Sequence, residues 1–549
     1  MGIFDPVLPA YDPIAWSKLP FAERGRLVCQ AWALQGYGTP PGVYIVYAIK
    51  VLFYIGMWVV FCRFTPGLGQ LSTISSWWLD PIAFQKAIAW SMAFELLGLG
   101  CGSGPLTGRY NPPIGGFLYF LRPGTTKLPL FPGLPLLGGL RRTWFDVLLY
   151  ATTLGGLAWL LTSSSFPIEA IALVVAALAL LGVTDKTLFL AARAEHYWTT
   201  LTCMLLLGSA GSWIAGAKAV QLALWFWAGV SKLNPHFPAV VCVMTSNSPF
   251  TRFAWLRKRM YRSYPDDLRP ARFAAWMGHA GTALEFAVPL VLIWAPGGAP
   301  LIVGLALMLA LHVYITSNVP MGVPIEWNFM MVYGGFALFW AHPEVSVLEL
   351  GITPTTGFLL IMLVALPLLG NLFPRAISFL LSMRYYAGNW AYGVWLFRGE
   401  SHRKLDQLKK SSGWVFDQLA PFYDLPTAHA LVSKVMGFRL MHLHGRALVE
   451  LVPQAVDRLE DYEWADGELI AGLALGWNFG DGHLHDEQLL RSIQAQCAFE
   501  PGELRCIFVE AQPLGRMTQQ WRIVDANTGT IAQGELSVRE LLERQPWSR

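Results

Sequence analysis

Long windows with almost no charged residue recur along this chain as far as Phe373. Each window of about twenty residues is long enough to cross a hydrocarbon core of roughly 30 Å as a single helix. Only 14% of the 549 residues are charged, whereas a soluble domain carries about 25%. A buried core helix explains one such window, but it does not explain a series of them. The sequence therefore predicts a protein that crosses the membrane repeatedly.

We expect about ten transmembrane helices. Their predicted bounds are 43–64, 82–101, 144–161, 170–183, 189–207, 213–231, 273–294, 300–316, 327–340 and 357–373. Trp77, Trp213 and Trp327 lie near proposed ends, where amphipathic rings favour the membrane interface. A polar segment precedes the first apolar window, which argues against a removable signal peptide.

Lysine and arginine are distributed unevenly between alternate loops. The loops at 163–167, 209–211 and 296–299 contain none, whereas the loop at 252–272 contains the densest group in the chain. Short loops rich in these residues remain in the cytoplasm. We therefore expect a multi-pass membrane protein with both termini in the cytoplasm.

Two predicted cytoplasmic loops are unusual. The loop at 102–142 is rich in Gly and Pro, so it either covers the mouth of the bundle or forms a solvated surface loop. The basic cluster at 252–272 is interleaved with aromatic residues. Beside a membrane, this pattern favours anchoring to anionic lipid headgroups, and we expect no nucleic-acid partner.

The fold class that follows is an all-α polytopic membrane bundle with a C-terminal soluble α+β domain. Residues 1–42 are expected to form a cytoplasmic N-terminal segment, 43–376 the transmembrane bundle, and 377–398 an amphipathic interfacial segment. Residues 399–549 are expected to form the soluble cytoplasmic domain. Within it, 486–498 has helical spacing, 505–511 is typical of a strand, and 521–538 of a hairpin.

Ionisable residues inside the predicted spans are costly and are functional candidates by default. They are Lys50, Glu95, His196, Lys218, Lys232, His279, Glu285 and His312. Lys50 and Lys218 have long side chains that can place the charged group at the membrane interface. Once each helix is given its direction, the others gather in the cytoplasmic half of the bundle, with Glu285 near the midplane.

Such a cluster is compatible with acid–base chemistry. A lysine at position 232, next to Trp225 and Trp227, loses the water that stabilises its ammonium form, and a neutral amine can act as a base. His196 is then a candidate donor to a developing anion, and Glu285 a candidate for orienting the lysine or balancing its charge. A network of hydrogen bonds that only holds the helices together is an equally good interpretation.

Three segments resemble a known family. Trp227-Ala-Gly-Val-Ser-Lys232-Leu-Asn-Pro-His-Phe resembles the lysine-bearing motif of the vitamin K-dependent γ-carboxylase superfamily, which includes the horizontally transferred transmembrane domains. Glu195-His196-Tyr-Trp resembles its histidine-bearing helix start, and Leu311-His312-Val-Tyr its later histidine segment. The likeness covers about a third of the chain, from 144 to 340. The whole chain also looks like a bacterial transmembrane family whose function is not established.

The resemblance implies that Lys232 is a catalytic base and His196 the partner of a carbanion or oxyanion, and Glu285 and His312 complete the expected catalytic set. It also implies a quinol as cofactor. Glu195 and Ser231 depart from the family pattern, and nothing corresponds to its large exported domain. Carboxylation of protein glutamate is therefore not implied. What remains is a quinol- or lipid-linked reaction of a lyase or oxygenase type. Candidate substrate-binding residues are Glu95, Glu195, His279, Trp227, Asn234 and Arg122.

We expect no metal site. The pairs His442/His444 and His483/His485 lack further ligands at suitable spacing, and the seven cysteines are dispersed.

Three functions stay open. The first is an intramembrane enzyme that acts on a quinone or a lipid-linked small molecule, and the second is a carrier or flippase for a lipid or quinone. The third is a scaffold whose residues 399–549 dock a cytoplasmic protein. Membrane lipids and a hydrophobic small molecule are the expected partners of the first two.

Overall fold

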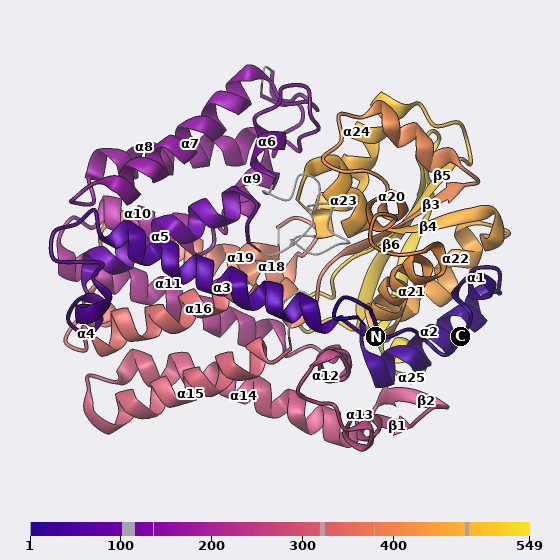
Figure 1. Ribbon diagram of the computed structural model, residues 1–549, viewed down its shortest axis with the longest axis horizontal. Helices are drawn as coiled ribbons and strands as arrows, with labels where there is room; N and C mark the ends of the chain where they lie inside the picture. The colour runs from indigo at the N-terminus through magenta and orange to yellow at the C-terminus, as the bar shows by residue number, and fades with distance from the viewer. Residues whose placement is uncertain are drawn as a thin grey trace.

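The computed structural model describes residues 2–100, 116–135, 137–318, 324–377, 379–477 and 482–548. Figure 1 shows two parts, a bundle of long helices on the left and a sheet with its own helices on the right. Both chain termini lie on the right, at the end of the bundle that carries the sheet. The two termini are therefore at the same end of the molecule.

Five helical segments are long and apolar enough to cross a membrane. They are α3 (Pro41–Cys62), α7 (Trp144–Thr162), α14 (Arg272–Trp294), α15 (Gly298–Thr316) and Pro354–Leu372, which contains α17 (Pro354–Leu360) and α18 (Leu366–Leu372). The chain is thus a multi-pass membrane protein.

The other five expected spans coincide with helices that are shorter, interrupted or less apolar. These are α5 (Pro81–Leu96), α8 (Ile168–Thr184), α10 (Tyr197–Leu206), α11 (Ala210–Ser231) and α16 (Ile325–Gly334). The expected number of about ten spans therefore stays a prediction. The proposed end of the second span at 101, and the loop residues up to 115, lie outside the described residues.

One expected span is broken near its start. Residues 189–207 form the end of α9 (Lys186–Ala191) and the whole of α10, and Arg193 between them has a φ of 49°. A residue other than glycine rarely adopts this left-handed backbone conformation. The break brings charged side chains of residues 193–196 into the interior of the bundle, where they are buried.

The described part of the Gly/Pro-rich loop is packed in one segment and exposed in another, since residues 130–135 are exposed. After α6 (Phe117–Phe120), residues 125–129 are buried, and Lys127 Nζ lies 2.8 Å from both carboxylate oxygens of Asp146 in α7. Tyr119 OH donates to Ala474 O at 2.6 Å. The described residues of the loop therefore contact both the bundle and the sheet region, and a position over the mouth of the bundle stays a prediction.

The sheet has five antiparallel strands in the order β4-β3-β5-β6-β7. They are β3 (Tyr392–Arg398), β4 (Tyr462–Asp466), β5 (Leu504–Val509), β6 (Thr518–Asp525) and β7 (Gly529–Ser537). In the register, Trp395 pairs with Ala465 on one side and with Cys506 on the other. The strand at β5 and the hairpin β6–β7 lie where the sequence predicts them.

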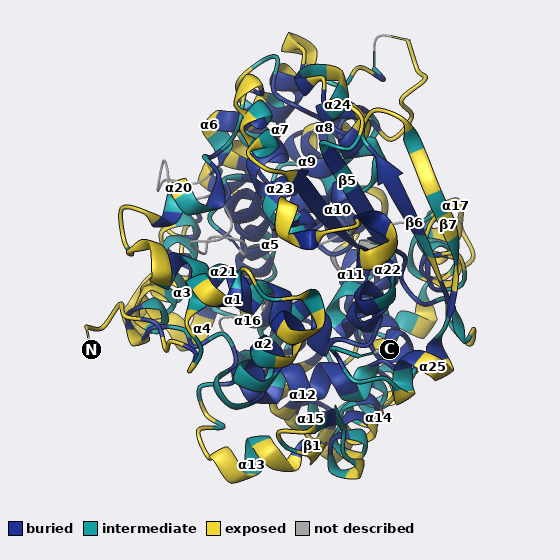
Figure 2. Ribbon diagram, turned by 90° about the vertical axis from the view of Figure 1, so that its right-hand side faces the viewer, coloured by how far each residue is buried: buried dark blue, intermediate teal, exposed yellow. Residues whose placement is uncertain are grey.

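Both faces of the central strand β3 are buried. Trp395 and Phe397 pack into a core that continues into the bundle, whereas Val394 and Leu396 pack into a second core on the opposite face. Figure 2 shows the neighbouring strand β5 in dark blue, with helices on either side of the sheet. A strand with two buried faces has a continuous apolar sequence and no alternation.

This burial explains a wrong expectation about residues 377–398. The sequence analysis assigned them to one interfacial segment, but the structure contains α19 (Phe379–Ser382), a short turn and then strand β3. The sheet thus begins before position 399. Strand β3 is hydrogen-bonded on both edges. Its aromatic side chains pack into the cores on the two faces of the sheet.

The N-terminal segment packs on the sheet region. The short α1 (Pro13–Trp16) and α2 (Phe21–Gln35) share the second core with α21 (Leu425–Met441), and the rings of Trp32 and Phe438 are 5.6 Å apart. The remaining helices around the sheet are α20 (Val415–Leu419), α22 (Leu448–Ala455), α23 (Gly467–Leu475), α24 (Glu487–Cys497) and α25 (Val538–Glu543).

A small excursion connects the bundle helices α11 and α14. It contains α12 (Phe237–Asn247), α13 (Ala254–Arg259) and a two-stranded hairpin of β1 (Tyr261–Ser263) and β2 (Asp267–Pro270). Figure 1 places α13 and the hairpin at the end of α14 that faces the sheet region. The bundle also contains the short helix α4 (Ile74–Trp77).

Candidate functional site

Lys232 lies at the C-terminal end of α11 and contacts Glu285 in the middle of α14. Lys232 Nζ forms an ion pair with Glu285 Oε2, and the two side chains are 9% and 4% exposed. The ring of Phe237 lies 5.4 Å from Lys232 Nζ. The sequence analysis proposed Glu285 as a partner that orients Lys232 or balances its charge, and in the structure this carboxylate lies against the amine.

His312 is held by hydrogen bonds on both ring nitrogens. Trp225 Nε1 donates to His312 Nε2 at 3.0 Å, and His312 Nδ1 contacts the side-chain oxygen of Asn328. Asn328 Nδ2 in turn donates to the backbone oxygen of His312 at 3.0 Å. Since an amide oxygen can only accept, the proton of this imidazole is on Nδ1. Both nitrogens are occupied, so His312 is a rigid part of the wall.

These groups border a cavity of about 160 Å³, which we call the junction cavity. It lies where the bundle meets the sheet region. The bundle contributes Lys232, Glu285 and His312, and the segment around β3 and α21 contributes Tyr386, Trp390 and His442. Most of the lining is aromatic or aliphatic, so the ion pair is the charged feature of a largely apolar chamber.

His196 lies behind one wall of the junction cavity. Trp327 Nε1 donates to His196 Nδ1 at 3.1 Å, and the Trp327 ring stacks on Tyr386 with centroids 4.9 Å apart. Trp327 and Tyr386 border the cavity, whereas His196 does not. The expected partnership of Lys232 with His196 is therefore not formed in this structure. The histidines that border the cavity with Lys232 are His312 and His442.

Glu95 and Glu195 belong to a second buried group on the far side of this aromatic wall. Arg193 Nε donates to Glu95 Oε1 at 2.8 Å, and its Nη1 donates to the hydroxyl of Tyr386. Tyr386 OH donates to Glu195 Oε1 at 3.2 Å. The sequence analysis did not single out Arg193, although this residue lies inside the expected span 189–207. The signal was a charged residue inside an otherwise apolar window.

The whole chain, residues 1–549, matches the family described as "Transmembrane protein of unknown function (DUF3556)". The chain belongs to the DUF3556 family. No curated protein and no solved structure matches it. The likeness of this DUF3556 protein to the γ-carboxylases therefore depends on the three short motifs alone.

Four of the expected substrate-binding residues lie away from the junction cavity of this DUF3556 protein. His279 is exposed on α14, and Arg122 is exposed in the loop before α7. Trp227 Nε1 donates to Leu363 O at 2.7 Å, so it binds α11 to the last span. Asn234 Nδ2 donates to Gln512 O at 3.1 Å and joins the bundle to the sheet region. Trp227 and Asn234 therefore have structural partners.

The lysines inside the bundle also have partners. Lys50 Nζ lies 2.6 Å from Glu326 Oε1, and Lys218 Nζ donates to the backbone oxygens of His342 and Val345. Lys86, which the sequence analysis did not single out, donates to three backbone oxygens at the ends of neighbouring helices. In the DUF3556 bundle, these lysines thus form hydrogen bonds to backbone carbonyl groups or ion pairs with carboxylates.

The histidine pairs of the sheet region are buried. His442 and His444 pack around Trp390, with ring distances of 4.9 and 5.2 Å, and His483 Nε2 lies 2.9 Å from Glu510 Oε1. Among the described residues, no three or more His, Cys, Asp or Glu side chains are arranged to hold a metal ion.

Proposed function

We propose that this DUF3556 protein is an integral membrane enzyme that binds a hydrophobic small molecule with a polar end in the junction cavity. The single observation that carries the proposal is the buried Lys232–Glu285 pair inside a largely apolar chamber. A charged pair is costly to bury. In a membrane protein, ionisable groups at such a place are functional candidates.

The size of the cavity limits the part of the molecule that enters it. An engineered protein cavity of about 150 Å³ holds one benzene ring, and the junction cavity measures about 160 Å³. One ring or a short polar head therefore fits, whereas a long acyl or isoprenoid tail must lie outside. Tyr314 borders the cavity and is 43% exposed on α15, which favours a tail that leaves toward the lipid on this side.

The ion pair supplies the chemistry in this proposal. The ammonium group of Lys232 is a proton donor and the carboxylate of Glu285 an acceptor, so together they can exchange a proton with the polar end of the ligand. This assignment differs from the neutral lysine base of the carboxylase-like hypothesis. In our proposal, Glu285 accepts a proton from the polar end of the ligand, and Lys232 acts as a base only after its ammonium group has given its own proton to the ligand.

A quinol headgroup is compatible with this cavity. It is a single ring with oxygen atoms that Lys232 can reach as a donor, and the aromatic walls can pack on its faces. When bound, a quinol supplies two-electron redox chemistry. The residues of this chain would hold the ring, exclude water and move a proton at its oxygen atom.

Mass spectrometry of small molecules that remain bound to the purified protein tests the binding site. We expect one amphipathic species that is depleted at least tenfold in Ala228→Phe, because Ala228 borders the junction cavity. Gly281→Phe is the matched control, since a side chain at Gly281 meets nothing within 4 Å. Recovery of bulk membrane lipids alone from the wild type would refute the proposal.

Lys232→Arg separates an enzyme from a carrier or flippase. Arginine keeps the positive charge beside Glu285, but it does not release a proton at neutral pH. An enzyme of the proposed type will accumulate its unreacted substrate, so the bound species will differ in mass between wild type and variant. A carrier will bind the same species in both proteins, and this result would leave the catalytic part of the proposal without support.

A further inference from the structure

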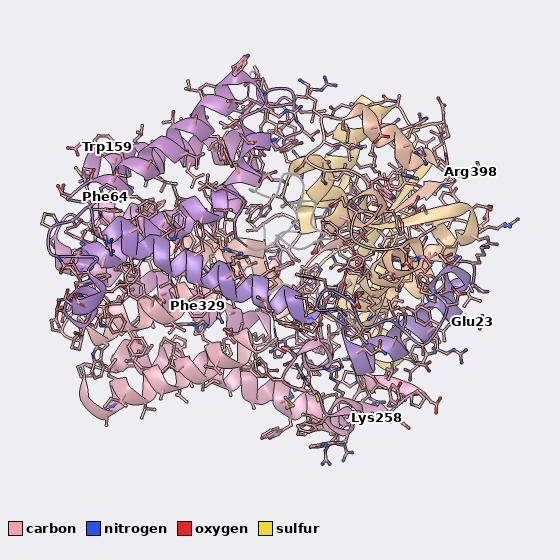
Figure 3. All side chains as sticks on the ribbon, viewed as in Figure 1. Glu23, Phe64, Trp159, Lys258, Phe329 and Arg398 are labelled. Atoms are coloured by element: carbon pink, nitrogen blue, oxygen red, sulfur yellow. The ribbon has the colours of Figure 1, made fainter. Side chains whose placement is uncertain are left out.

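An exposed group of basic and aromatic side chains surrounds α13. We define the α13 patch as Phe250, Arg252, Phe253, Trp255, Lys258 and Arg259. Phe250 is 73% exposed, and Phe253 and Trp255 are 64% exposed each. Arg252, Lys258 and Arg259 are also exposed. Figure 2 shows α13 in yellow at the lower edge of the molecule, and Figure 3 shows Lys258 at the corresponding edge, far from Arg398.

The α13 patch lies at the level where a membrane span begins. The guanidinium of Arg259 lies 5.5 Å from the ring centroid of Phe273, in the first turn of α14. Trp276, one turn further along this span, is 66% exposed. Exposed tryptophans at the end of a span are typical of the headgroup layer. The contact between Arg259 and Phe273 therefore places α13 in this layer.

The positive charges of the patch are not neutralised by carboxylates. Two nearby carboxylates are used by other arginines: Asp267 pairs with Arg269, and Glu543 pairs with Arg262 and Arg269. Among the described residues, the exposed Asp266 of the hairpin forms no ion pair with the patch. Within the described parts of the chain, no ion pair involves Arg252, Lys258 or Arg259. Their charges are therefore available to an external anion.

Another arginine holds the patch in place. Arg257 Nε donates to Thr251 O at 2.6 Å, and its other nitrogens donate to Ser248 O and Leu34 O. These bonds fix α13 against α2 and the end of α12. The patch is thus a rigid surface with a defined orientation toward the membrane.

We infer that the α13 patch binds the headgroups of anionic phospholipids, with its aromatic rings inserted among the lipids and its three free cations on the phosphates. Charge and position support this partner. A basic residue near an anionic membrane surface strengthens binding by about fivefold, and aromatic rings beside such residues are typical of interfacial segments. Anionic lipid bound at the α13 patch would hold the N-terminal end of α14, the helix that contains Glu285. The inference does not depend on any ligand of the junction cavity.

Reconstitution in bilayers of equal parts phosphatidylglycerol and phosphatidylcholine tests the inference. After gentle extraction, mass spectrometry of the intact protein gives the ratio of the two lipids that remain bound. We expect the wild type to retain an excess of phosphatidylglycerol. The triple variant Arg252→Gln/Lys258→Gln/Arg259→Gln will reduce this excess by at least tenfold, and the excess in the wild type will fall as salt is raised.

The control changes the same charge elsewhere. Arg398→Gln/Arg403→Gln/Arg458→Gln removes three exposed arginines of the sheet region, and we expect it to retain the wild-type ratio. An equal loss in this control, or an unchanged ratio in the α13 variant, would overturn the inference. If the triple variant does not fold, the single change Lys258→Glu gives the same comparison at an exposed site.

The experiment also separates lipid from nucleic acid. The intact protein in phosphatidylcholine alone is titrated with a single-stranded oligonucleotide. We expect no binding that depends on the α13 patch. Binding that is lost in the triple variant, without any excess of phosphatidylglycerol in the wild type, would assign the patch to nucleic acid and reject the inference.

Discussion

Single residues decide how far the sequence could predict the site. Lys232, Glu285 and His312 border one cavity, as their clustering in one half of the predicted spans indicated. His196 was expected beside Lys232 but is separated from the cavity by Trp327. Helix periodicity gives the position of a residue along a span, but it does not give the rotation of one span against another. The aromatic wall between the two sites could therefore not be predicted.

The first prediction at this scale concerns the buried ion pair. Lys232→Met will destabilise the protein by about 3–5 kcal/mol, because it leaves the Glu285 carboxylate buried without its partner. The double variant Lys232→Met/Glu285→Met will recover most of this loss, since two apolar side chains leave no buried charge. Thermal unfolding in one fixed detergent measures both. A double variant as unstable as the single one would contradict the pairing.

The second prediction concerns His442 in the sheet region. Burial, with smaller contributions from charge repulsion by Arg439 and His236, lowers the pKa of His442 to about 3, although its hydrogen bond to Phe438 O opposes the shift. The unfolded chain, with a pKa of about 6.5 for histidine, binds a proton that the folded chain does not. The free energy of unfolding will therefore fall as the pH decreases below about 6.5, by up to about 1.4 kcal/mol per pH unit for this residue.

The variant His442→Asn tests this dependence. Asparagine can keep a donor near the Phe438 carbonyl, which His442 Nδ1 contacts at 2.7 Å, but it does not titrate. Plots of unfolding free energy against pH between pH 7.5 and pH 5 will show a smaller slope in the variant, whereas an identical slope would show that His442 binds a proton equally in the folded and the unfolded states.

At the scale of helices and strands, the sequence predicted the simplest elements best. The hairpin β6–β7 and helix α24 lie where alternation and helical spacing placed them. Strand β3 was missed, because its two buried faces remove the alternation that identifies a strand. The break between α9 and α10 was missed as well, because Arg193 adopts a backbone conformation that a residue-by-residue pattern does not reveal.

Close packing of α7 on α8 gives a prediction for these elements. A Cβ atom on Gly156 would lie 2.7 Å from Val174 Cγ2, whereas a Cβ on the adjacent Gly155 meets nothing within 4 Å. Gly156→Leu will therefore destabilise the bundle by about 1–3 kcal/mol through overpacking. Gly155→Leu is the control and will retain the thermal stability of the wild type. Equal effects of the two changes would contradict the observed helix contact.

For the molecule as a whole, the sequence analysis separated the bundle from its C-terminal part but did not predict how they join. Residues 1–42 share a core with α21, and the sheet shares a core with the bundle. These contacts are between segments far apart in the chain, and a single sequence gives no signal for them. The junction cavity, which both parts border, could not be predicted for the same reason.

A prediction at this scale concerns the contact between the two parts. Asn234 binds Gln512 O and Gly515 N of the sheet region through its side chain. Asn234→Ala will remove both bonds at a cost of about 1–3 kcal/mol, and it will speed amide hydrogen exchange in residues 512–516. Asn527→Ala, which removes a bond to Phe499 O within the sheet region, is the control and will leave that exchange unchanged.

The central position of β3 has a consequence for how the protein is made. Its first partner along the chain is β4 at Tyr462–Asp466, and its second is β5 at Leu504–Val509. Ribosomes add about 5–20 residues per second, so this apolar strand emerges several seconds before the first partner and longer before the second. During that interval the nascent chain exposes an unpaired, aggregation-prone segment directly behind its last membrane span. Early termination of translation after Phe397 would leave this segment permanently unpaired and make the product a target for quality-control proteolysis.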